Sequence, residues 1–153
     1  MMIETERLHL YPASDEQMEQ LIAEQTVPEL KAAYQEMLDG CRLHPDKREW
    51  YAVWNMERND ESHAAVGNFS FRGLGEDGIL EIGYGTNAEY EGQGYMTEAV
   101  LAVVHWAAAQ DGVKQIEAET DPDNAASQRV LEKAGFVPTG KYGEEGPRFV
   151  WKG

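Results

Sequence analysis

The spacing of hydrophobic residues along the first part of the chain predicts one strand followed by two helices. Leu8 and Leu10 are two positions apart and would therefore share one face of a short strand. Ser14 suits the N-terminus of a first helix. Pro28 suits the first turn of a second helix, whose hydrophobic residues recur at helical spacing until Gly40, the expected stop.

The second part of the chain predicts a sheet with two further helices. Turns rich in Gly, Asn and Asp separate the hydrophobic stretches. This order predicts a mixed α/β fold around one central sheet, and the absence of repeats or linkers predicts a single domain over residues 1–153. The predicted elements are strands at 50–58, 64–72 and 79–86, a helix at 97–110, a strand at 113–120, a helix at 124–134 and a hairpin at 136–151.

Composition narrows the classes of function. The chain has 13 Lys and Arg against 28 Asp and Glu, a formal charge of −15. Such a surface repels nucleic acid and attracts a cationic partner, although acidity that serves only solubility is the alternative. No stretch approaches the roughly 20 apolar residues of a membrane span, and the acidic N-terminus does not resemble a secretory signal. We therefore expect a cytoplasmic protein that binds neither nucleic acid nor membrane.

The loop at residues 91–96 is the first candidate site. It lies between a predicted strand and a predicted helix and contains Gly92 and Gly94. Exposed backbone N–H groups and the positive end of the helix suit a pyrophosphate, whereas a tight turn that needs glycine is the alternative. A Walker A loop would need Gly-Lys-Ser/Thr, and a dinucleotide fingerprint would need glycine at Thr97. A different pyrophosphate carrier is therefore favoured.

The predicted strand before this loop has one face with few side chains. Glu81, Gly83 and Gly85 alternate along that face. Glycine inside a strand often marks the close approach of a ligand, and a pantetheine arm could hydrogen-bond there; a bulge or bend is the alternative. Glu81 could remove a proton from an attacking ammonium group. An ion pair across the sheet is the alternative role for Glu81.

The start of the last predicted helix offers two more candidates. Asn124 suits a helix N-cap and could also hold an amide of the ligand. Ser127 lies three residues later, so both side chains could point to the same side. Ser127 could donate a hydrogen bond to a leaving thiolate, or it could be an ordinary solvated residue of the first turn. The four histidines show no metal-ligand spacing, and no metal is expected.

Four segments in this order resemble the GCN5-related N-acetyltransferase (GNAT) superfamily. The resemblance covers essentially the whole chain. It is nearest to the branch of ribosomal-protein N-terminal acetyltransferases often termed RimJ/RimL-like, whose first strand also resembles residues 4–10 here. Two positions depart from the family pattern, with Glu91 where Gln or Arg is usual and Leu131 where many relatives have tyrosine. The four segments are residues 80–84, 92–99, 124–127 and 132–136.

The resemblance implies an acetyl-CoA-dependent N-acetyltransferase. The amine of a peptide N-terminus or a small molecule would attack the acetyl group directly, and a non-catalytic acyl-CoA-binding sensor or interaction module is the alternative. It implies a GNAT fold whose mostly antiparallel sheet is splayed at the acetyl-CoA site and flanked by about four helices, in a monomer or homodimer. The implied catalytic residues are Glu81 and Ser127, and the implied cofactor-binding residues are Tyr84, Gly85, Thr86, Glu91, Gly92, Gln93, Gly94, Tyr95, Met96, Thr97 and Asn124.

Overall fold

A computed structural model describes residues 2–72, 74 and 76–152. Within this part of the chain, eight strands form one sheet in the order β1-β2-β3-β4-β5-β6-β8-β7. All neighbouring strands pair antiparallel except β5 and β6, which are parallel. The strands are β1 (Ile3–Glu4), β2 (Leu8–Pro12), β3 (Val53–Arg58), β4 (Ala65–Arg72), β5 (Ile79–Thr86), β6 (Gln115–Glu119), β7 (Phe136–Tyr142) and β8 (Pro147–Trp151).

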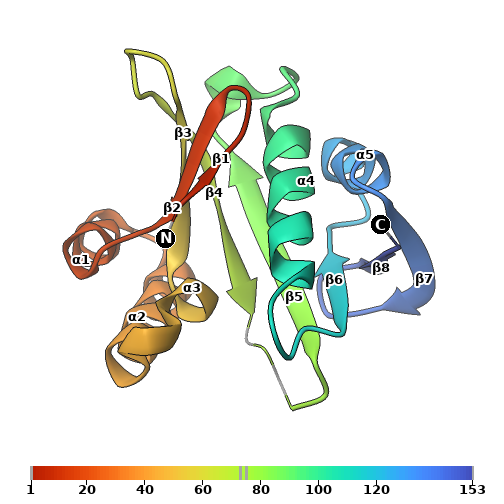
Figure 1. Ribbon diagram of the computed structural model, residues 1–153, viewed down its shortest axis with the longest axis horizontal. Helices are drawn as coiled ribbons and strands as arrows, with labels where there is room; N and C mark the ends of the chain where they lie inside the picture. Colours follow the sequence, from red (N-terminus) through yellow and green to blue (C-terminus); the bar gives the residue numbers. More distant parts are fainter. Residues whose placement is uncertain (1, 73, 75, 153) are drawn as a thin grey trace.

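Helices surround this sheet, so the predicted mixed α/β fold is confirmed. Figure 1 shows α4 lying along the sheet, with β1 to β4 on one side of it and α5, β7 and β8 on the other. No helix in the described residues is long and apolar enough to cross a membrane. The helices are α1 (Asp15–Glu24), α2 (Pro28–Leu43), α3 (Arg48–Tyr51), α4 (Tyr95–Ala108) and α5 (Ala125–Lys133), with short 3-10 helices at Pro45–Lys47 and Ala88–Tyr90.

Several predicted boundaries are wrong, and three of these differences have a local reason. Gly40 does not end α2, which continues to Leu43. Gly40 lies inside the helix, where Tyr51 packs against it and leaves no room for a side chain. A Cβ at Gly40 would be 2.6 Å from Tyr51 Cδ1. The strand expected from residue 50 begins only at Val53, since α3 precedes it. Helix α4 begins at Tyr95, two residues earlier than expected, because left-handed glycine at residue 94 caps it.

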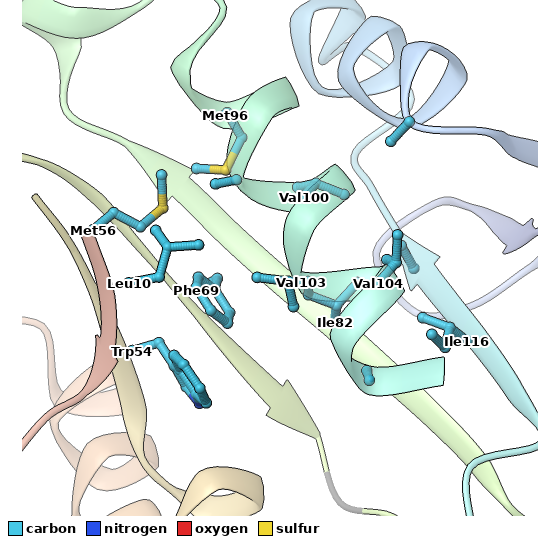
Figure 2. Packing of buried hydrophobic residues seen from close by; sticks show 14 of the residues in the cluster. Leu10, Trp54, Met56, Phe69, Ile82, Met96, Val100, Val103, Val104 and Ile116 are labelled. Carbon is cyan, nitrogen blue, oxygen red and sulfur yellow. The ribbon is translucent and has the colours of Figure 1, made fainter. Parts of the chain in front are cut away.

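The apolar face of α4 packs on the sheet. Val100, Val103 and Val104 are buried at helical spacing. Figure 2 shows these side chains beside Phe69 of β4 and Ile82 of β5, in one continuous core. Burying each such side chain stabilises the fold by roughly 1.5–3 kcal/mol. This packing fixes the start of α4 next to the end of β5. It therefore places between them the loop that contains Gly92 and Gly94, which we call the glycine loop.

Strands β5 and β6 separate beyond Ile82. Their parallel register runs from Ile79 opposite Gln115 to Ile82 opposite Ala118. The rest of β5, residues 83–86, remains paired with β4 but has no partner on the β6 side within the described residues. The sheet is thus splayed where the family resemblance implied, between β5 and β6.

Candidate active site

A cavity of about 240 Å³ lies at this splay. Its walls come from the end of β5, the glycine loop, the first turn of α4, and α5. Glu81 and Gln93, among the predicted site residues, do not line it. The predicted residues that do line it are Tyr84, Gly85, Thr86, Glu91, Gly92, Gly94, Tyr95, Met96, Thr97, Asn124 and Ser127.

The glycine loop presents unpaired backbone donors to the cavity. Gly92 has φ 75° and Gly94 has φ 80°, in the left-handed region that glycine adopts without a steric cost. Within the described chain, the N–H groups of residues 92–97 have no hydrogen-bond partner, and the first helical bond runs from the Glu98 N–H to the Gly94 carbonyl at 3.1 Å. A run of unpaired N–H groups at the start of a long helix suits phosphate oxygens.

Arg7, for which the sequence pattern gave no indication, directly precedes β2 and holds this loop in place. Its guanidinium lies 4.2 Å from the ring centroid of Tyr95 and donates to the Gln93 carbonyl at 3.1 Å. It also pairs with Glu98 at 2.7 Å, and the Thr5 hydroxyl donates to the same carboxylate. Burial alone would raise the pKa of Glu98, but the hydrogen bonds from Thr5 and Arg7 outweigh it and lower that pKa.

Helix α5 adds two cations that the sequence analysis also missed. Arg129 and Lys133 are four residues apart, so they lie one turn apart on the helix surface, and both line the cavity. Neither forms a salt bridge within the described residues. The charged residues of the cavity are therefore these two cations and Glu91. The cavity is locally cationic in a strongly acidic chain, which offsets the unusual acid at the start of the loop.

Tyr84 and Ser127 connect β5 with α5 across the mouth of the splay. The Tyr84 hydroxyl lies 2.9 Å from Ser127 Oγ and donates to the Ser127 carbonyl at 3.1 Å. Burial raises the pKa of Tyr84 to about 12, and the hydrogen bond with Ser127 opposes this only in part. The phenol is therefore neutral at pH 7 and can donate a proton. Asn124 caps α5 by accepting from the Ser127 N–H at 3.0 Å, so its side-chain NH2 group remains for a ligand.

Glu81 lies in a cluster of charges that connects adjacent strands. One carboxylate oxygen contacts Arg148 at 2.7 Å and the other contacts Arg72 at 3.3 Å. Arg148 also binds Glu117 at 3.0 Å and Glu119 at 2.8 Å. This is the cross-sheet pairing given above as the alternative role of Glu81. Its role as a general base remains a prediction, and the carboxylate would first have to exchange a guanidinium for the substrate.

A second, larger cavity of about 570 Å³ adjoins the first. Tyr84 and Gly85 line both cavities, so the end of β5 is their common wall. Gly83 lines only the second one. A Cβ built on Gly83 or Gly85 would meet nothing within 4 Å. The glycine face of β5, expected beside the pantetheine, therefore opens mainly onto the second cavity.

A family model described as the acetyltransferase (GNAT) domain matches residues 4–137. The chain therefore belongs to the GNAT acetyltransferase family, and the resemblance drawn from its four sequence segments is confirmed. Among curated relatives, the uncharacterized N-acetyltransferase YjdG of Bacillus subtilis (strain 168) is 36% identical over 92 residues, which is 60% of this chain and 54% of that protein. The match thus spans about half the length of that relative.

Solved structures of low sequence identity share the fold. The ribosomal-protein-S5-alanine acetyltransferase of Vibrio fischeri aligns with a TM-score of 0.74 at 18% identity, over 98% of this chain and 94% of that one. RimL, the ribosomal L7/L12 α-N-protein acetyltransferase, in a complex with coenzyme A, aligns with a TM-score of 0.71 at 18% identity, with coverage of 98% and 94%. These neighbours show that the chain shares their fold.

Proposed function

We propose that this GNAT domain transfers an acetyl group from acetyl-CoA to a primary amine. One observation carries the proposal: a single cavity is lined by residues 92 and 94–97, whose N–H groups are unpaired, by the two cations of α5 and by the Tyr84–Ser127 pair. Membership of the acetyltransferase family supports the type of reaction. The complex of the structural neighbour RimL with coenzyme A supports the type of ligand.

The residues present fit acetyl-CoA. The loop backbone would hold the pyrophosphate, because Gly92 and Gly94 leave its N–H groups accessible. Arg129 and Lys133 would neutralise anionic groups of the same ligand. The backbone from Tyr84 to Thr86, in the half of β5 that has no partner strand on the β6 side, would pair with the pantetheine amides. When bound, the thioester supplies the activated carbonyl that an amine can attack.

The protein would then manage the protons of the reaction. An ammonium group first loses a proton to water, and the neutral amine nitrogen bonds to the carbonyl carbon while the carbon–sulfur bond breaks. The Tyr84 hydroxyl, at the wall common to both cavities, gives its proton to the leaving sulfur. Tyr84 recovers a proton from the acylated nitrogen through Ser127 or water. The products are an N-acetylated amine, a free thiol and the proton first released.

The test combines calorimetric titration of acetyl-CoA with a free-thiol assay over a panel of amines. Tyr84→Phe keeps the ring but removes the proton donor, so we expect kcat to fall about 100-fold with the Kd for acetyl-CoA unchanged. Tyr142→Phe is the matched control, because Tyr142 is 75% exposed on β7. Full kcat in Tyr84→Phe would exclude this acid, and acetyl-CoA binding without thiol release from any amine would favour the sensor instead. An unchanged kcat in Glu81→Gln would exclude Glu81 as the general base and would limit its role to the ion pairs described above.

A further inference from the structure

The second cavity has walls that are mainly apolar and aromatic. They come from α2, α3 and the strands β3 to β5, and no residue of the glycine loop is among them. Among the described residues, two charged ones line it, Glu36 and Arg72, and they have opposite signs. Arg72 already pairs with Glu81 and Glu145. The apolar walls include Leu30, Tyr34, Met37, Trp50, Tyr51 and Phe71.

Two polar side chains lie on the floor of this cavity, next to the glycines of β5. Asn68 pairs in register with Gly85, and Ser70 pairs with Gly83. Both side chains line the cavity, and neither forms a hydrogen bond within the described residues. They offer acceptor oxygens to an amine at the end of the cavity that adjoins Tyr84. An amine held there would have its remaining atoms between α2 and α3.

The size and charge of the cavity restrict what can bind. Its volume of about 570 Å³ is within the range of roughly 300–1,000 Å³ that is usual for small-molecule sites. A polyamine or aminoglycoside would bring several ammonium groups against aromatic walls with one available carboxylate, Glu36. Burying the remaining charges without partners is unfavourable. The formal net charge of the whole chain, −15, thus attracts an approaching amine at long range, but the residues that line this cavity do not share that negative charge.

We infer that the second cavity is the acceptor site and that it selects a small primary amine with one positive charge on an aromatic or branched aliphatic body. This inference rests on the proposed acetyltransferase function. The amine nitrogen lies at Asn68 and Ser70, one strand away from the shared wall, and the apolar body contacts Tyr34 and Trp50. The shared wall brings the nitrogen to the acetyl group without passing through the loop that holds the pyrophosphate.

The first experiment compares acceptors at saturating acetyl-CoA by thiol release. The panel contains 2-phenylethylamine, spermidine, kanamycin and a tetrapeptide with a free N-terminus. We expect kcat/KM for 2-phenylethylamine to exceed that of each of the others at least tenfold. A higher value for spermidine or kanamycin would overturn the charge argument, and a higher value for the peptide would overturn the assignment to a small molecule.

The second experiment places a larger side chain in the cavity. Ala33→Leu fills part of it from α2, and Ala32→Leu makes the same change at the neighbouring exposed position, which does not line the cavity. We expect Ala33→Leu to raise the KM for 2-phenylethylamine at least tenfold, with Ala32→Leu within twofold of the parent. Both variants should keep the parent Kd for acetyl-CoA and the parent Tm. Equal KM values in the two variants would overturn the assignment of this cavity.

A binding measurement separates this inference from the proposed function. Calorimetric titration of 2-phenylethylamine into the protein saturated with CoA requires no catalysis. Binding that Ala33→Leu weakens would support the acceptor site even if no thiol were released, and only the transferase proposal would then fail. If amines cause thiol release but Ala33→Leu changes neither amine binding nor KM, the transferase proposal stands and the assignment of the acceptor site is overturned.

Discussion

The two cations of α5 give the sharpest quantitative prediction about the cofactor cavity. Arg129→Gln and Lys133→Met remove the charges but keep side chains of similar length on a helix surface. A unit charge pair at about 4 Å in water is worth about 1 kcal/mol. Because both side chains are exposed, this high-dielectric value applies, and each variant should raise the Kd for acetyl-CoA about fivefold. The double variant should raise it about 30-fold.

Salt dependence distinguishes this electrostatic effect from a structural one. The Debye length falls from about 10 Å at 0.1 M to about 3 Å at 1 M salt, so the difference in Kd between parent and double variant should shrink at high salt. Isothermal titration at both ionic strengths measures it. Lys141→Met is the matched control, because Lys141 is exposed on β7 and does not line the cavity. The reasoning is refuted if the double variant binds like the parent at low salt, or if Lys141→Met loses as much affinity.

Three further predictions concern single positions. Gly92→Ala forces a side chain into φ 75°, so it should cost about 1 kcal/mol of stability by urea unfolding and weaken acetyl-CoA binding several-fold by calorimetry. Arg148→Met leaves three partly buried carboxylates without their common partner and should cost about 3 kcal/mol at pH 7. Burial alone would raise the pKa of Glu119, but the hydrogen bonds from the Glu145 N–H and Arg148 outweigh it and lower that pKa. The stability that Glu119 contributes is therefore lost as the pH falls through the lowered pKa, and the gap between Arg148→Met and the parent should narrow over the same acidic range. Gly40→Ala should lower Tm despite the better helix propensity of alanine, because its Cβ would be 2.6 Å from the Tyr51 ring; an increase in Tm would contradict this packing.

The glycine loop and the cap of α5 could be predicted because their signals are local. Gly92 and Gly94 adopt backbone angles that other residues rarely adopt, so their identity alone indicates the conformation. Asn124 is the N-cap of α5, as its residue type indicated. The splay between β5 and β6 came from the family resemblance, since no spacing of residues specifies where two parallel strands separate.

The partners of charged residues could not be predicted because they are distant in the sequence. Arg7 contacts Gln93 and Glu98 across about 90 residues, and only the assembled sheet brings them together. Glu81 on β5 meets Arg148 on β8 across the intervening strand β6, so its residue type alone left both a base and an ion pair open. The helical spacing of Arg129 and Lys133, by contrast, was available in the sequence and would have indicated a cationic face on α5.

The two cavities divide the chain at the end of β5. Residues lining the second cavity come from positions 30–85, and those lining the first come from positions 84–133. A chimaera of two related proteins, joined at this strand, would therefore take the lining of one cavity from each parent. Libraries confined to the first half could then diversify one cavity by random mutagenesis while the glycine loop and α5 remain unaltered.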